Sequence, residues 1–162
     1  MDFADETPEQ FGESLQVYVT GAMVFSQLCT KWMLEQYPDV PEHALHKKGT
    51  LIFTGTLGAL RTNPGYAAYG AGRSGVRMLA QSLAREYSAK GIQVVHAIAN
   101  GGITDAYHDY GHGEKKQEDV EKVLKGAKMR AESVGRLYLT IMEQECDLWC
   151  HELDMRPAAE RF

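Results

Sequence analysis

Tyr69 and Arg73 are the residues whose types and spacing point most directly to chemistry. They stand four positions apart, so a helix across them places both side chains on one face. A guanidinium beside a phenol stabilises the phenolate, which would let Tyr69 act as an acid or a base. Arg73 is itself a fixed cation and cannot pass a proton along a relay. Thr56 adds a hydroxyl that could hold a carbonyl or hydroxyl oxygen against Tyr69.

A long helix is predicted over residues 8–36, ahead of these groups. Thr7 can cap it, Pro8 fits the first helical position, and Gln10 completes a capping-box pattern. Apolar side chains then recur at helical spacing until the chain approaches Pro38, which ends the pattern.

Two buried strands, 50–54 and 92–98, are predicted on either side of a helix over 66–88 that carries Tyr69. The run at 50–54 lacks polar alternation, so we expect a strand that is buried on both faces. Strand, helix and strand in this order predict a right-handed parallel crossover. His96 falls in the second strand, where we expect a satisfied core histidine.

The remainder of the chain predicts a loop over 104–116, charged helices over 118–144 and a last strand over 149–153. Residues 1–162 are therefore expected to form a single domain of the α/β class. Its core would be a parallel sheet of about three strands flanked by helices.

Metal and disulfide sites are not expected. His108 and His112 have the spacing of metal ligands on a helix, but two glycines nearby disfavour a helix there. Cys29, Cys146 and Cys150 are odd in number and lack the spacing of a disulfide framework. We interpret all three as small reduced residues.

The overall charge excludes some classes of partner. The formal net charge is −5 and the basic residues are scattered, unlike the basic patch of a nucleic-acid binder. Apolar runs are interrupted within about ten residues, whereas a membrane-spanning helix needs roughly 20. The acidic start lacks the order of a secretory signal, which predicts a cytoplasmic protein.

The segment from residue 49 to residue 104 resembles the short-chain dehydrogenase/reductase family. Gly49-Thr-Leu-Ile-Phe-Thr-Gly-Thr56 is similar to the fifth strand of that family, and Tyr69-Gly-Ala-Gly-Arg73 is similar to its Y-x-x-x-K helix. Tyr69 follows Thr56 by thirteen positions, the same spacing as that from the serine to the tyrosine of the family. The resemblance implies a truncated Rossmann-like fold.

The resemblance also implies a set of catalytic residues, which this sequence keeps only in part. The family uses an Asn, a Ser, a Tyr and a Lys around a bound nicotinamide, and only the tyrosine, Tyr69, is unchanged here. The corresponding positions carry Tyr18 for the asparagine, Thr56 for the serine and Arg73 for the lysine. Asn100 replaces a proline that usually precedes the glycines. Tyr69 is therefore either active or a packed aromatic inherited from an ancestor.

A substrate site is expected around this group. Tyr18 would line a pocket or fill core space, and Asn100 would lie nearby. The loop over 104–116 matches the substrate lid of the family, in which three residues would contact a ligand or face water: Tyr107, His108 and Tyr110.

The dinucleotide-binding half of the family is not recognised in the sequence. The family begins with a glycine-rich turn and about four strands that hold the dinucleotide, and no G-x-x-x-G-x-G occurs here. We therefore expect no cofactor, and isomerisation, cyclisation or dehydration of a small oxygenated molecule through Tyr69. Two alternatives are an NAD(P)-dependent oxidoreductase completed by a partner chain and a noncatalytic interaction module.

Partner chains are expected at two places. Family members commonly form homodimers through the two helices that correspond to 8–36 and 66–88. The strand edge at 51–54 would lack the neighbour that it has in the family, so a second copy or a different protein is expected to cover it.

Overall fold

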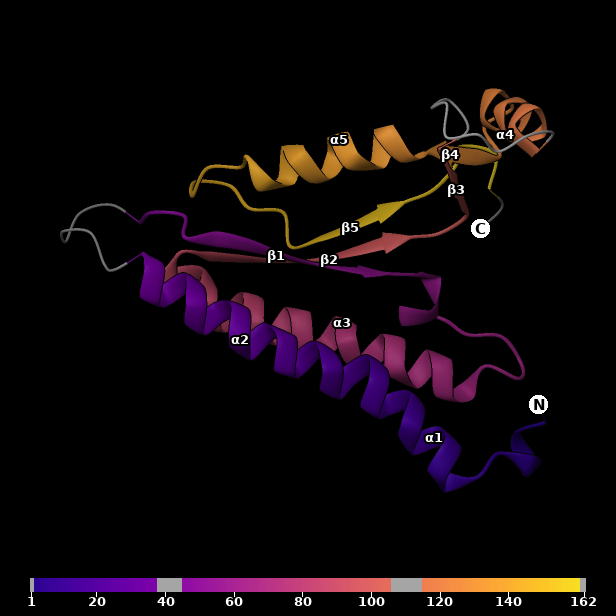
Figure 1. Ribbon diagram of the computed structural model, residues 1–162, viewed down its shortest axis with the longest axis horizontal. Coiled ribbons are helices and arrows are strands. Elements are labelled where there is room, and N and C mark those ends of the chain that lie inside the picture. The colour runs from indigo at the N-terminus through magenta and orange to yellow at the C-terminus, as the bar shows by residue number, and fades with distance from the viewer. Residues whose placement is uncertain (1, 38–44, 106–114, 161–162) are drawn as a thin grey trace. The chain divides into compact units, whose positions relative to one another are not determined.

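The computed structural model describes residues 2–37, 45–105 and 115–160 of the chain (Figure 1). Its contacts divide the chain into two compact units. The first consists of Met1–Ile98 and Glu145–Leu153, and the second consists of Ala99–Gln144 and Asp154–Phe162. No helix among the described residues is both long enough and apolar enough to cross a membrane.

A three-stranded parallel sheet is the centre of the fold. β1 (Gly49–Gly55) pairs in parallel with β2 (Ile92–Ala99), and β5 (Glu152–Met155) lies on the other side of β2. The last pairing is also parallel, because the hydrogen bonds from His96 N to His151 O and from Asn100 N to Met155 O advance together along both strands. The predicted α/β class with a three-stranded parallel sheet is thus confirmed.

The predicted helix over 8–36 is helical throughout, but it contains one π-helical turn. α1 (Pro8–Leu15) is followed by a π-helical turn, Gln16–Thr20, and then by α2 (Gly21–Gln36). The capping box forms as predicted: Thr7 Oγ1 accepts from the backbone N–H of Gln10 at 3.2 Å, and Gln10 Oε1 accepts from that of Thr7 at 3.1 Å.

α2 and α3 (Ala67–Tyr87) lie side by side on one face of β1 and β2 (Figure 1). Apolar side chains from the strands and from α3 form the core between them. Its buried members are Leu51, Phe53, Val76, Ala80, Ala84, Ile92 and Val94.

β1 differs from the expected strand buried on both faces. Leu51, Phe53 and Gly55 are buried, but Thr54 between them is exposed, so the strand alternates. Only β2, the central strand, is buried along nearly its whole length. β1 has β2 as its single neighbour within the described residues, and an edge strand needs burial on the helix side only.

The second unit has two strands that the sequence did not predict. β3 (Gly102–Thr104) pairs in parallel with β4 (Lys128–Arg130), and β4 separates α4 (Lys115–Leu124) from α5 (Ala131–Met142). The first of the charged helices predicted over 118–144 therefore ends at Leu124, and Gly126 takes a positive φ of 69° just after it.

The ends of two elements differ from the prediction. α4 begins within the expected loop over 104–116, of which residues 106–114 lie outside the described residues. The predicted strand at 149–153 begins later, as β5 at Glu152, because the chain first passes through irregular backbone after α5.

Candidate active site

A hydrogen bond between two hydroxyl groups lies at the centre of the candidate site. Thr56 follows the last residue of β1, and Tyr69 stands in the first turn of α3. Thr56 Oγ1 and Tyr69 Oη are 2.8 Å apart. Thr56 Oγ1 also accepts from the backbone N–H of Gly58 at 3.2 Å, so its own proton remains available for donation.

Gly58 lets the turn after β1 approach the ring of Tyr69 closely. A Cβ atom at this position would lie 2.7 Å from Cε1 of Tyr69, closer than carbon atoms approach in folded proteins. The glycine therefore fixes how near the Thr56 hydroxyl can come to the phenol. Nothing in a local sequence pattern distinguishes this glycine from an ordinary turn residue.

Arg73 lies against the faces of two tyrosines. Its Cζ atom is 4.5 Å from the centre of the Tyr18 ring and 5.1 Å from the centre of the Tyr69 ring. The two rings meet edge to face, with centroids 6.0 Å apart and planes at 89°. These distances allow cation–π attraction to both rings, so the guanidinium is held beside the phenol.

Tyr18 lies in the π-helical turn between α1 and α2. Such turns shift the direction of side chains relative to a regular helix and often occur at functional sites. A Cβ atom at Gly72 would lie 2.9 Å from Cδ2 of Tyr18. Gly72 of α3 is thus explained by close contact with the π-helical turn that carries Tyr18.

The structure therefore brings together Tyr18, Thr56, Tyr69 and Arg73, all within the first unit. Asn100 belongs to the second unit, where its side-chain amide donates to the carboxylate of Glu160. Three predicted substrate-binding residues lie outside the described residues: Tyr107, His108 and Tyr110.

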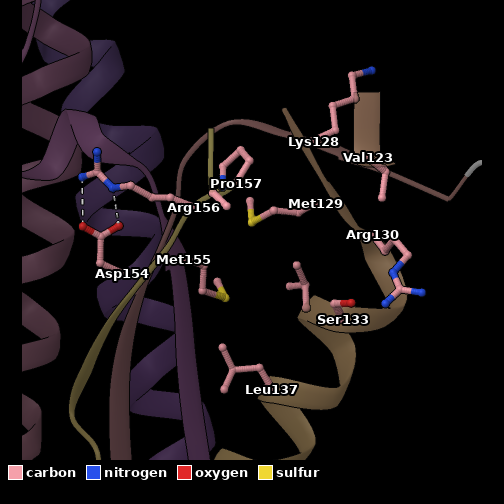
Figure 2. Close-up of a pocket in the computed structure, with 12 residues that line it drawn as sticks. Val123, Lys128, Met129, Arg130, Ser133, Leu137, Asp154, Met155, Arg156 and Pro157 are labelled. Carbon is pink, nitrogen blue, oxygen red and sulfur yellow. Dashed lines mark hydrogen bonds and ion pairs between the residues drawn. The ribbon is translucent and has the colours of Figure 1, made fainter. Parts of the chain in front are cut away.

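The second unit holds a cavity of about 430 Å³ with a mainly apolar lining. Figure 2 shows the charged ends of Lys128 and Arg130 directed away from the side chains of Met129 and Met155. Arg156 at its edge is held by Asp154 through two hydrogen bonds of 2.8 and 2.9 Å. The lining therefore lacks a free acid–base pair, and the Tyr69 group remains the better candidate for chemistry.

Comparison with known proteins agrees with this geometry. A family model described as enoyl-(acyl carrier protein) reductase matches residues 1–148. The chain belongs to the short-chain dehydrogenase/reductase family.

Relatives in this short-chain dehydrogenase/reductase family are distant. Tropinone reductase-like 2 of Erythroxylum coca is 28% identical over 137 residues, which cover 81% of this chain and 46% of that protein. Inactive 2-(S)-hydroxypropyl-CoM dehydrogenase 2 of Xanthobacter autotrophicus is 28% identical over 128 residues, or 79% of this chain and 50% of that protein. The chain thus spans about half the length of the curated relatives that it matches.

A solved structure shows the same fold. The short-chain dehydrogenase of Burkholderia cenocepacia, crystallised in complex with NADP, matches with a TM-score of 0.65 at 19% sequence identity. The match covers 97% of this chain and 59% of that one. The Rossmann-like arrangement expected from the sequence is thereby supported.

Sequence reasoning missed a charged pair that lies beside the buried His96. Arg77, one turn after Arg73, donates to Glu152 through hydrogen bonds of 2.6 and 2.8 Å. Nδ1 of His96 lies 3.6 Å from a carboxylate oxygen of Glu152. The hydrogen bonds from Arg77 hold the pKa of the Glu152 carboxyl below its usual range.

His96 is buried, as predicted, but it is not satisfied. Its side chain is 1% exposed, and neither ring nitrogen has a hydrogen-bond partner among the described residues. Gly55 makes room for the ring, since a Cβ there would lie 2.3 Å from Nε2. Burial, opposed in part by Glu152, lowers the pKa of the His96 imidazole and so favours its neutral form.

Because the pKa of His96 is lowered, we expect the folded protein to lose stability on mild acidification. As the pH falls below about 6.5, the unfolded chain takes up a proton at this histidine more readily than the folded chain, in which the pKa of His96 is lowered. The free energy of unfolding should fall with pH in this window, by up to about 1.4 kcal/mol per pH unit. Urea unfolding between pH 5 and 8 measures this slope. His96→Leu should reduce this slope, and the control His46→Leu should not change it. An unchanged slope in His96→Leu would show that His96 is not its source.

Proposed function

We propose that Tyr69 acts as a general acid on the oxygen of a small alcohol or carbonyl compound, and that Thr56 donates a second hydrogen bond to that oxygen. The observation that carries this proposal is the 2.8 Å contact between their hydroxyls, with Arg73 against the Tyr69 ring. A substrate oxygen placed beside both hydroxyls would receive one proton and one further hydrogen bond. A fixed cation nearby favours the phenolate that remains.

Chemistry of this kind needs no hydride. In enolisation, the Tyr69 phenol would donate its proton to a carbonyl oxygen while a proton on the neighbouring carbon leaves to a buffer base. Thr56 would donate a hydrogen bond to the same oxygen. Return of a solvent proton to carbon and of the enol proton to the phenolate restores both ketone and phenol. Isomerisation, cyclisation and dehydration of oxygenated molecules use steps of this type.

The residues of this chain include only some of those that would hold a nicotinamide dinucleotide. Thr56 and Tyr69 stand at the positions where the family performs hydride chemistry on a substrate. A dinucleotide also needs backbone N–H groups at a glycine-rich turn, and the printed sequence contains no G-x-x-x-G-x-G motif that would form one. We therefore derive no step from a nucleotide.

The main alternative is an NAD(P)-dependent oxidoreductase whose nucleotide site is supplied by another polypeptide. Membership of the family and the NADP complex of the Burkholderia cenocepacia relative support it. A noncatalytic interaction module is the third candidate. The curated relative from Xanthobacter autotrophicus, whose name includes the word inactive, is consistent with it.

Hydrogen exchange beside a carbonyl group tests the acid–base proposal directly. With cyclohexanone in D₂O and no nucleotide, the protein should speed deuterium uptake at the carbon beside the carbonyl, followed by proton NMR. Tyr69→Phe removes the acid and should slow the rate by about a hundredfold or more. Tyr66→Phe is a matched control, because the Tyr66 ring lies 6.2 Å from that of Tyr69 but is mostly exposed.

Two results would count against this proposal. A wild-type rate no faster than that of buffer, or one unchanged in Tyr69→Phe, would contradict acid–base catalysis by Tyr69. Tight binding of NADH or NADPH, measured by the fluorescence of the nucleotide, would favour the oxidoreductase alternative.

We further propose that the protein forms a homodimer through α2 and α3. Phe25, Leu28 and Trp32 form one stripe along α2 and are 58%, 65% and 56% exposed, and Met78 on α3 is 50% exposed. A contiguous apolar surface of this kind favours burial against another chain. The edge of β1 at 51–54 is a second place where a chain could pair.

A charge placed in the apolar stripe should separate the dimer. Leu28→Glu would bury an unpaired carboxylate and should convert the protein to a monomer in analytical ultracentrifugation. Leu148→Glu is the matched control, because Leu148 is equally exposed but lies outside both helices. A monomeric wild type, or a dimer that both variants retain, would contradict this interface.

A further inference from the structure

Among the described residues, the N–H donors of Arg73 have no hydrogen-bond acceptor. Its Nε–H is buried, and no described residue accepts a hydrogen bond from the guanidinium. Arg77, one turn further along α3, provides the contrast, because it holds Glu152 through two hydrogen bonds. A buried donor without an acceptor destabilises the folded protein. Such a cost is repaid when a ligand supplies the missing acceptor.

The two tyrosine rings leave the donors of Arg73 available. A guanidinium is planar, and its N–H groups point outward within that plane. Tyr18 and Tyr69 contact it through their ring faces, at 4.5 and 5.1 Å, and ring faces do not accept strong hydrogen bonds. The rings therefore hold the group in place without occupying the donors that fit a carboxylate.

We propose that Arg73 binds a carboxylate of the substrate and so presents the neighbouring oxygen to Tyr69 and Thr56. The substrate class is then a small oxo or hydroxy carboxylic acid. This inference rests on the proposed function for the chemistry at Tyr69, but carboxylate binding by Arg73 does not require that chemistry. A lysine at this position would carry the charge but not the planar, two-pronged set of donors.

Tyr18 is a positioning residue in this arrangement. Its ring covers one face of the guanidinium, and the room for that ring comes from Gly72. A side chain at residue 72 would displace Tyr18 and release Arg73 from its fixed position. The substitution Gly72→Ala should therefore weaken carboxylate binding without touching a ligand atom.

The experiment uses oxo acids and their neutral esters. The probes are 2-oxopentanoate and 4-oxopentanoate, each compared with its methyl ester and titrated into protein labelled with ¹⁵N-arginine. The Nε–Hε signal of Arg73, assigned through Arg73→Lys, should shift with the acids and not with the esters. Arg73→Met should weaken binding of the acids by about tenfold or more, the loss expected for hydrogen bonds to a charged group.

Three further variants separate the possible causes. Arg85→Met removes an exposed arginine of the same helix and should leave binding unchanged. Gly72→Ala should weaken binding while its circular dichroism stays that of the wild type. Tyr69→Phe should bind the acids within about threefold of the wild type, because only one hydrogen bond of the ligand is altered.

Several outcomes would overturn the inference. These are no binding of either acid to the wild type, equal binding of acid and ester, or binding that Arg73→Met does not weaken. Displacement of the acids by NADH that itself needs Arg73 would assign the arginine to a nucleotide instead. Intact carboxylate binding with no exchange activity would leave this site standing and refute only the proposed acid–base function.

Discussion

The contact between the hydroxyls of Thr56 and Tyr69 ties together the end of β1 and the first turn of α3. It forms only because several neighbours allow a close approach. Gly58 lets the turn touch the phenol ring, and the N–H of Gly58 orients the threonine oxygen. Arg73 then lies against the same ring. A fixed pair of hydroxyls beside a cation is what gives this part of the fold a chemical capability, since such groups act without costly rearrangement.

The sequence predicted the parts of the fold that are governed by local rules. A capping box placed the start of α1, and short apolar runs placed β1 and β2. The spacing of Thr56 and Tyr69, taken with the family resemblance, placed both hydroxyls in one site. These features depend on residues within one element, or on a motif whose spacing is itself the signal.

Other features depend on pairs of residues far apart in the sequence. Gly55 and His96 fit one another across two strands, and Glu152 joins them from β5. Tyr18 and Gly72 fit one another across two helices. Each glycine by itself gives no indication of its partner, so these contacts could not be predicted. The strand β4 was missed for a different reason, because a strand of three residues carries too short a pattern.

The direct test of the central interaction is a double-mutant cycle in urea unfolding with Thr56→Val, Tyr69→Phe and the double variant. Thr56→Val also removes the acceptor for the N–H of Gly58, but this loss occurs on both sides of the cycle and cancels. A half-buried hydrogen bond between the two hydroxyls predicts a coupling free energy of about 1 kcal/mol. Strict additivity of the two single substitutions would show that the hydroxyls do not interact and would contradict the account.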